Sequence, residues 1–442
     1  MPKFLRELAI LFAILAATDL SAQVSSVSPY SRIGLGSIQT QNYTRSIGFG
    51  GANLALGDAF YINAANPASY AQLDLTSLEV GFFNNTIIQE QANPDIRLEN
   101  SNSGLRYFSV GVPLTDWWGS SLGLQPYATR GYDITTTRLG PDSIEVEDRF
   151  VGSGSLNRLY WGHGFTVLPG LDLGLNASFI FGKIQDQNFI NWGGGINNSV
   201  FDEQISVRSI VLDYGLQYRL SLGKNEIAFG ATYGSATDFN TNSESYSYVT
   251  TPNGLPIDSV VSTGEGSTRL PSSWGAGIVF GRIADNHLNR GWWSTSRYAW
   301  SVSADIESFQ GADFVDTDGT NPYNNSLRTE LGWRIIPALM NEEVNRKGNY
   351  FSRIEYRLGG YYEQTPTSIN GRTLPDYGIT FGLGLPISQN LGPGENRRSI
   401  VNAGFVFGRR GTLQDGLIRE SYFKLFIGIT FNDKWFIDYK YR

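Results

Sequence analysis

Apolar and polar residues alternate along most of this chain. From Leu171 to Gly182 almost every second residue is apolar, and the residues between them are mostly small or polar. Successive side chains of a β-strand point to opposite faces, so this segment predicts a strand with one apolar face and one polar face. The same alternation returns at 210–221, 226–233, 297–307 and 377–387. It predicts a protein of the all-β class.

The alternation predicts about fourteen strands. Their expected spans are 76–84, 104–114, 118–128, 156–168, 171–182, 206–221, 226–237, 272–281, 297–308, 325–336, 351–363, 375–387, 399–409 and 419–432. Tilted strands of about ten residues are long enough to cross a membrane core. Short periplasmic turns are expected at 115–117, 169–170 and 222–225. Extracellular loops are expected at the longer polar links, 85–103, 129–155, 183–205, 238–271, 309–324, 364–374 and 410–418.

A soluble β-sandwich or propeller would also alternate, but several features favour a membrane barrel. The face opposite the apolar stripe carries charged residues such as Asp213, Arg219 and Asp305, which suit a polar lumen. No repeat of about 40 residues is visible, which argues against a propeller. Tryptophans gather near expected strand ends, as an interfacial girdle requires, at Trp117, Trp118, Trp292, Trp293 and Trp435. We therefore predict a transmembrane antiparallel β-barrel.

The beginning of the chain has the features of an export signal. Lys3 and Arg6 precede an apolar run from Leu8 to Ala17, and Ser21-Ala22-Gln23 offers a small-residue cleavage site after Ala22. A buried N-terminal helix is the alternative interpretation. No later stretch of 18 apolar residues follows, so the sequence predicts no transmembrane helix. An exported protein without such a helix is either soluble or a barrel.

Composition narrows the classes of function. Aromatic residues make up 13% of the 442 residues, glycine occurs 51 times and charged residues are only 17%, as in a β protein with a large apolar surface. The net charge of −7 argues against a nucleic-acid partner. Cysteine is absent, which excludes disulfides and thiol catalysis. The only histidines are His163 and His287, so a histidine-rich metal site is excluded and no cofactor is predicted.

No catalytic motif is found, and we predict that the chain is not an enzyme. Gly48-Phe49-Gly50-Gly51 is not followed by the Lys-Ser/Thr pair of a phosphate loop. His163 stands without a nearby nucleophile motif and is interpreted as a wall or girdle residue. The acidic stretch 313–319 is more typical of a solvated loop than of a calcium site. Wall salt bridges are favoured over a solute-selective constriction for Arg328, Glu330, Arg334, Arg353, Glu355 and Arg357.

Residues 23–72 do not alternate and are rich in small residues. A fourteen-stranded barrel is too wide for its own wall side chains to fill. A segment of small residues can pack its backbone closely against the walls, so this region predicts a hatch inside the lumen. A flexible periplasmic tail is the alternative. The hatch motif that we single out comprises Gly48, Gly50, Gly51, Asn66, Pro67 and Ala68.

The run from Gly48 to Ala68 resembles the N-terminal hatch of the FadL-type family of long-chain fatty acid transporters. Arg357-Leu358-Gly359-Gly360-Tyr361-Tyr362 before Thr365-Pro366 is similar to the same family, as are Leu270–Gly275, Ser303-Ala304-Asp305 and the strand from Gly378 to Leu385. The order of these motifs covers nearly the whole mature chain. The ending from Phe431 to Arg442 resembles FadL-like members from Bacteroidota, in which relatives also serve as barrel subunits of larger machines.

The resemblance implies a plugged barrel that takes up hydrophobic small molecules, with release by hatch movement or lateral opening of the wall. We therefore expect a signal peptide at 1–22, the hatch at 23–72 and an outer-membrane barrel at 73–442, with both termini periplasmic. Outer-membrane lipid and a hydrophobic ligand are the expected partners. The alternative is a barrel subunit of a protein secretion or assembly machine, with other envelope proteins as partners. No individual ligand-binding residue is predicted.

Overall fold

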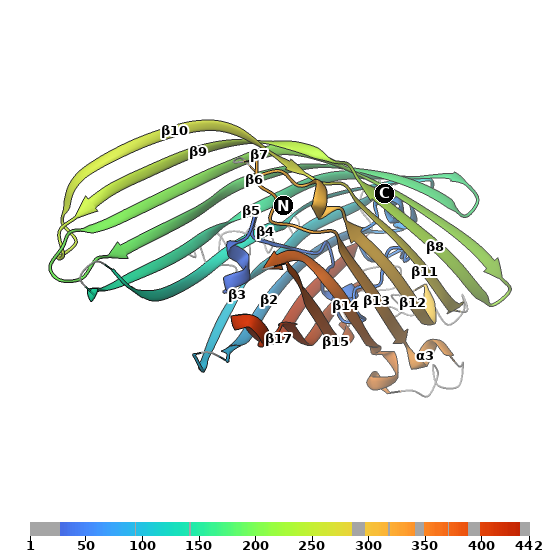
Figure 1. Ribbon diagram of the computed structural model, residues 1–442. Coiled ribbons are helices and arrows are strands. Elements are labelled where there is room, and N and C mark those ends of the chain that lie inside the picture. Colours follow the sequence, from blue (N-terminus) through green and yellow to red (C-terminus); the bar gives the residue numbers. More distant parts are fainter. Residues whose placement is uncertain are drawn as a thin grey trace, which may run out of the picture.

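The computed structural model describes residues 27–92, 94–140, 143–284, 297–316, 319–340, 349–369, 371–387 and 398–433. It is a closed barrel of long antiparallel strands with the N-terminal segment inside it (Figure 1). The strands are β1 (Ser37–Ile38), β2 (Thr76–Gln91), β3 (Ile96–Thr115), β4 (Trp118–Leu139), β5 (Glu145–Leu168), β6 (Leu171–Asn191), β7 (Asn198–Leu222), β8 (Asn225–Gly234), β9 (Thr237–Thr250), β10 (Pro256–Leu270), β11 (Ser273–Ile283), β12 (Tyr298–Phe309), β13 (Ser326–Ile335), β14 (Glu355–Ile369), β15 (Arg372–Ile387), β16 (Arg398–Gly411) and β17 (Ile418–Asp433). The short helices are η1 (Pro29–Arg32), α2 (Thr44–Ile47), η2 (Pro67–Gln72), η4 (Gly311–Asp313), α3 (Pro337–Met340), η5 (Tyr350–Arg353) and η6 (Gln414–Gly416).

The wall of the barrel has fourteen strand positions. From β2 to β17, strands that follow one another in the chain pair antiparallel, apart from β8 with β9 and β10 with β11, and β17 pairs with β2 to close the ring. β8 pairs with the second half of β7 and β9 with the first half, so β8 and β9 share one position. β10 pairs with β9 and β11 with β8, so β10 and β11 share the next. The prediction of a fourteen-stranded barrel with an N-terminal hatch in its lumen is confirmed.

Side chains along the wall strands alternate between the outer face and the lumen, as predicted. On β6, Leu173 and Phe179 point outward and are 40% and 41% exposed, whereas Asp172 and Ser178 point inward and are fully buried. A continuous outward apolar band is what a barrel presents to the hydrocarbon of a membrane. Among the described residues, no helix is long and apolar enough to cross a membrane.

Five of the seven expected extracellular loops are instead mostly paired strand. The link 85–103 is the hairpin of β2 and β3, and the link 364–374 is that of β14 and β15. The links 129–155, 183–205 and 238–271 continue the ladders of β4 to β7 and form the hairpin of β9 and β10, so the loop prediction was wrong in all five places. Figure 1 shows the region of β4 to β7, β9 and β10, which we call the tall sheet, extending far beyond the other strands. Toward its far edge the tall sheet is exposed on both faces, since the neighbouring residues Val260 and Val261 are 65% and 56% exposed. Apolar alternation therefore ends there, while the backbone hydrogen bonds of the sheet continue.

Inward tyrosines cover glycines on neighbouring strands. The ring of Tyr107 lies where a side chain at Gly81 would begin, and Tyr160 covers Gly123 in the same way. A Cβ at either glycine would overlap the ring, so the cross-strand pair requires glycine. Such rings shield exposed backbone and pin the register of the two strands. The other pairs of this kind are Tyr132 with Gly152, Tyr361 with Gly378 and Tyr422 with Gly408.

Candidate functional site: the hatch, the lumen and a seam in the wall

The N-terminal segment runs along the lumen from one end of the barrel to the other. Ser28 N donates to Gly131 O at 2.9 Å, and the hydroxyl of Tyr30 donates to Ile418 O, both toward the strand ends that carry the long connections. The segment reaches the opposite end at Leu75, where β2 begins. Most of its residues are buried, above all those from Asn42 to Asp58. We call residues 27–75 the hatch segment.

A row of glycines on the inner wall receives the hatch. Gly119, Gly164, Gly174 and Gly215 are cross-strand partners on β4, β5, β6 and β7. A Cβ at Gly174 would overlap the carbonyl carbon of Pro67, and the other three glycines lie equally close to the backbone or the side chain of the hatch around Asn66–Ala71. Only glycine lets two backbones approach this closely. The wall is therefore shaped to hold η2.

The opposite wall holds the first part of the hatch in the same manner. Gly332 and Gly359 are cross-strand partners on β13 and β14, and a Cβ at either would overlap the backbone of Phe49. Gly50 has a φ of +88°, and a side chain there would overlap Leu331 O. Gly48 lies against Gly382 of β15. The glycines of the predicted hatch motif thus contact the wall directly; their function in gating remains a prediction.

The second half of the motif is built around the side chain of Asn66, which is fully buried. Its Oδ1 accepts a hydrogen bond from Ala68 N at 3.1 Å and caps η2, which Pro67 begins. Its Nδ2 donates to Leu54 O at 2.7 Å and to Leu216 O on β7 at 3.1 Å. One side chain therefore joins two parts of the hatch to the wall.

Replacing Asn66 with alanine is expected to loosen this joint. The change removes a cap and two buried hydrogen bonds to carbonyls, of which Leu54 O keeps a second donor in Gln217 Nε2, and the loss is roughly 1–3 kcal/mol. Hydrogen exchange of residues 54–70 should increase several-fold, and the melting temperature should fall. Asn191→Ala, at an exposed turn where the side chain accepts only from Gly193 N, is the control and should change neither. Unchanged exchange in the Asn66 variant would refute a joining function for this side chain.

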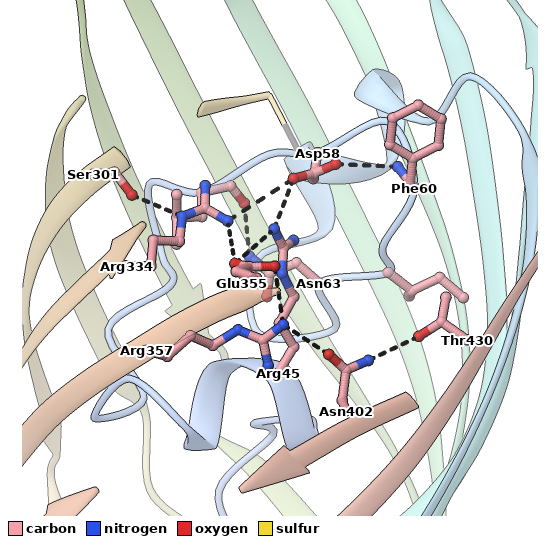
Figure 2. A network of polar contacts seen from close by, with 12 residues as sticks. Arg45, Asp58, Phe60, Asn63, Ser301, Arg334, Glu355, Arg357, Asn402 and Thr430 are labelled. Atoms are coloured by element: carbon pink, nitrogen blue, oxygen red, sulfur yellow. Dashed lines mark hydrogen bonds and ion pairs between the residues drawn. The ribbon is translucent and has the colours of Figure 1, made fainter. Parts of the chain in front are cut away.

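A buried charge network locks the hatch to β13 and β14 (Figure 2). Arg45 of α2 donates to Asp58 Oδ2 at 3.0 Å and to Glu355 Oε1 at 3.4 Å. Arg334 Nη1 donates to the same Glu355 oxygen at 3.4 Å, and Arg357 donates to Glu355 Oε2 at 3.0 Å. Burial opposes the charge of Arg45, but the carboxylates of Glu355 and Asp58 hold its pKa above the ordinary value. Three arginines thus share the carboxylate of Glu355.

Other inward carboxylates bind the hatch backbone. Asp305 Oδ2 on β12 accepts from Leu54 N at 2.7 Å, and Glu79 Oε1 on β2 accepts from Ile62 N at 2.7 Å. Buried amide groups need such acceptors because no water replaces them. The hatch is thus fixed by polar groups from several sides of the wall.

A cavity of about 1080 Å³ lies beside the hatch. Part of its lining belongs to an apolar cluster in which Tyr127, Val211 and Leu270 of the wall meet Phe314 and Tyr323 of the β12–β13 connection. The rings of Phe314 and Tyr323 lie with centroids 4.7 Å apart. Another part of the lining carries charge pairs, Arg158 with Asp213, Arg328 with Glu363 and Arg410 with Asp376. The cavity is therefore apolar on one side and charged on another.

The barrel wall has a seam between β3 and β4. Their ladder stops at Phe108 and Leu124, although both strands continue beyond it. A bulge on β4 follows, between Pro126 and Ala128. Bulges bend a strand and end its pairing, so β4 leaves β3 here. The residues on either side of the seam, including Arg106 and Tyr127, also line the cavity.

The hatch closes this seam. β1 pairs with β4 through Ser37 and Ile38, and Gln39 N donates to Tyr127 O at 2.9 Å. From the other side, Arg106 on β3 donates to Gln39 Oε1 at 2.7 Å and to Thr40 O at 2.8 Å. Residues 37–40 thus take the place of a wall ladder between the two strands.

A family model described as BamG matches residues 4–442. The chain belongs to the BamG family. A search of curated proteins finds no match to this chain.

Two solved structures show the fold to which this BamG-family chain is similar. A Pseudomonas aeruginosa FadL homologue is 12% identical, with a TM-score of 0.54 over 91% of this chain and 100% of that one. The Pseudomonas putida toluene transporter TodX is 15% identical, with a TM-score of 0.50 over 90% of this chain and 99% of that one. At these identities the likeness shows the fold alone. The expected resemblance to FadL-type barrels is confirmed at that level.

Five of the charged residues singled out in the BamG-family sequence, Arg328, Glu330, Arg334, Glu355 and Arg357, form ion pairs on the wall strands. Arg328 pairs with Glu330 at 2.5 Å, and Glu355 pairs with Arg334 and Arg357. Arg353 was predicted on the strand 351–363 together with Glu355 and Arg357. That prediction was wrong, because Arg353 lies in η5 and β14 begins at Glu355. Arg45 and Asp58 were not predicted as members of the network, because neither stands in a recognisable motif.

The other predicted positions are partly described. His163 faces outward among Trp118, Trp161 and Phe165, and its Nδ1 accepts from Trp118 Nε1 at 3.2 Å. Trp117 packs at the same place, as expected of a girdle. The predicted signal peptide at 1–22, Trp292, Trp293, Trp435 and His287 lie outside the described residues.

Proposed function

We propose that the chain is an outer-membrane channel that takes up hydrophobic small molecules and has no catalytic activity. The observation that carries the proposal is the seam between β3 and β4, which hydrogen bonds from the hatch hold closed. Hydrogen bonds to a separate segment can break without unfolding the wall. The short turns and the end of β17 at Asp433 would lie in the periplasm, whereas Ser28 and Tyr30 lie toward the opposite end of the barrel, so the periplasmic position expected for the N-terminus is not kept.

The proposed path begins on the apolar side of the cavity, where Tyr127, Leu270 and Tyr323 would receive an apolar solute. Displacement of residues 37–40 would then open the seam sideways into the membrane. Such a solute would avoid the buried charges below the cavity, because it would leave through the wall. The fold shared with the toluene transporter TodX supports this use of the barrel.

A disulfide across β1 and β4 is expected to block uptake. Ser37 and Thr129 are cross-strand partners, so Ser37→Cys with Thr129→Cys places the sulfur atoms within bonding reach. The chain has no cysteine of its own. Uptake of radiolabelled toluene and of a long-chain fatty acid by cells carrying the oxidised variant should fall about tenfold or more, because the gate must open for each passage. Reductant should restore it.

The control is a second disulfide far from the seam. Ser245→Cys with Ser262→Cys joins cross-strand partners on β9 and β10 and should leave uptake unchanged. Uptake at the unmodified rate by the oxidised seam variant would rule out lateral opening at β1.

The second candidate function is a barrel subunit of an outer-membrane secretion or assembly machine. The charge pairs in the cavity favour it, because an apolar solute beside Arg158, Asp213 or Arg410 would leave these groups poorly solvated. Membership of the BamG family is compatible with it. Native mass spectrometry of protein extracted from its own membrane in mild detergent separates the two. A lone barrel with a bound apolar molecule supports uptake, and a fixed complex with other envelope proteins supports the subunit.

A further inference from the structure

One margin of the tall sheet ends in an unpaired strand. β10 pairs with β9 from Pro256 to Leu270, and only Arg269 forms a bridge on its other side, to Val315. Within the part of the chain that the structure describes, residues 256–268 therefore have no partner on that side. β12 is the next strand of the wall, but it ends at Phe309, and the chain then turns toward the lumen. β12 therefore does not extend alongside β10. Figure 1 shows β10 as the outermost strand of this sheet.

The exposed edge is long and weakly protected. Ile257, Val260 and Val261 are 54%, 65% and 56% exposed. Proteins usually guard such edges with lysine, proline, bulges or a covering segment. Pro256 and a bulge guard the beginning of β10, but no lysine stands between 237 and 270. An unguarded row of backbone donors and acceptors is a template for another strand.

The charge of the hairpin selects the kind of strand that fits. Residues 237–270 carry four carboxylates, Asp238, Glu244, Asp258 and Glu265, against one arginine, Arg269. Pairing with a second copy of β10 would bring two acidic hairpins together, which like charges disfavour. A strand with positive charge would gain both backbone hydrogen bonds and electrostatic attraction.

We propose that the free edge of β10 is a docking site for an extended, basic segment of another protein at the cell surface. The segment adds as a further strand beside residues 257–268, above the low wall formed by β12 and β13. This proposal stands apart from uptake through the seam, because the edge lies on the tall sheet and away from residues 37–40.

The test uses two labelled synthetic peptides of twelve residues and the full-length protein in nanodiscs. One peptide alternates Val and Thr with Lys, and the other has Glu in place of each Lys. Fluorescence anisotropy should show binding of the Lys peptide, weakened by salt, and about tenfold weaker or no binding of the Glu peptide. Equal binding of both peptides, or binding of neither, overturns the proposal.

Two proline variants locate the site. Neighbouring residues of a strand direct their N–H groups to opposite sides, so one of Val260→Pro and Val261→Pro removes a donor from the free edge and the other disturbs pairing with β9. The variant that keeps the melting temperature should lose affinity for the Lys peptide by about tenfold or more.

The matched controls are Thr135→Pro and Thr136→Pro on β4, at the opposite margin of the tall sheet, where β3 no longer pairs. These should leave the affinity unchanged. Loss of affinity in these variants alone would place the peptide on the wrong edge and overturn the proposal. If the unmodified protein forms a dimer and the proline in β10 abolishes that dimer, the edge binds a second copy of this chain, and the proposal is overturned.

Discussion

Replacing Glu355 with alanine is expected to release the hatch and make the barrel conduct ions. Glu355 is almost fully buried and is shared by Arg45, Arg334 and Arg357. Its loss leaves three buried guanidinium groups with Asp58 as the one carboxylate that still pairs with them among the described residues, at 3.0 Å from Arg45 and 4.0 Å from Arg334, which costs roughly 3–5 kcal/mol. Moving Arg45 out of the lumen relieves this cost, because Arg45 is on the hatch while the other two arginines are on the wall. Planar-bilayer recordings should show frequent large openings that the unmodified protein lacks.

The control for this variant is Glu90→Ala. Glu90 also contacts two arginines, Arg97 and Arg419, but the group lies at the solvent-exposed rim. Exposed ion pairs contribute little to stability, so conductance and melting temperature should stay as they are. A closed barrel in Glu355→Ala, with the fold intact by gel mobility without heating, would show that the charge network does not hold the hatch.

Replacing Gly174 with leucine is expected to expel η2 from the wall. The backbone of Pro67 and Ala68 occupies the space that any side chain at Gly174 would need. The hatch also lies tightly against the neighbouring Gly164 and Gly215, so it cannot shift sideways along the wall to make room. A backbone contact cannot give way as a flexible side chain can, so the hatch must move. Conductance should rise, and added protease should cleave the hatch segment in a variant whose barrel strands stay resistant.

Gly264→Leu is the control for crowding by leucine itself. Gly264 lies on β10, and only the hydroxyl of Ser243 lies within 4 Å of an added Cβ. This variant should conduct no more than the unmodified protein. If Gly174→Leu also stays closed and resistant to protease, the row of glycines does not seat the hatch.

The sequence determined the wall of this barrel. Side chains of a strand alternate between two faces as a local property of the chain, so Asp172 and Leu173 could be assigned to lumen and lipid before any partner strand was known. Turns such as 169–170 and 222–225 were predicted because each is a short link between two alternating segments, which is also a local feature of the chain. The small residues from Gly48 to Ala68 also indicated a hatch, because the capacity for close backbone packing is a property of the residues themselves.

Where both faces of a strand meet water, the local pattern fails. The hairpin of β9 and β10 was predicted as a loop, because most of its residues are polar and its few apolar ones do not alternate regularly, so that only the pairing of backbone groups makes it a sheet. The free edge of β10 follows from the length of its neighbours, which no residue in β10 encodes.

Only the tertiary structure decided where the hatch is held and where the wall is open. The row from Gly119 to Gly215 exists through the registers of four strands, and each glycine in the sequence stands alone. Arg45 meets Glu355 across 310 residues, and Phe314 meets Tyr323 because their connection folds inward. The seam between β3 and β4 arises from a bulge and from the hatch strand that replaces their ladder. Each depends on contacts between distant segments, and periodicity along one segment carries no information about such contacts.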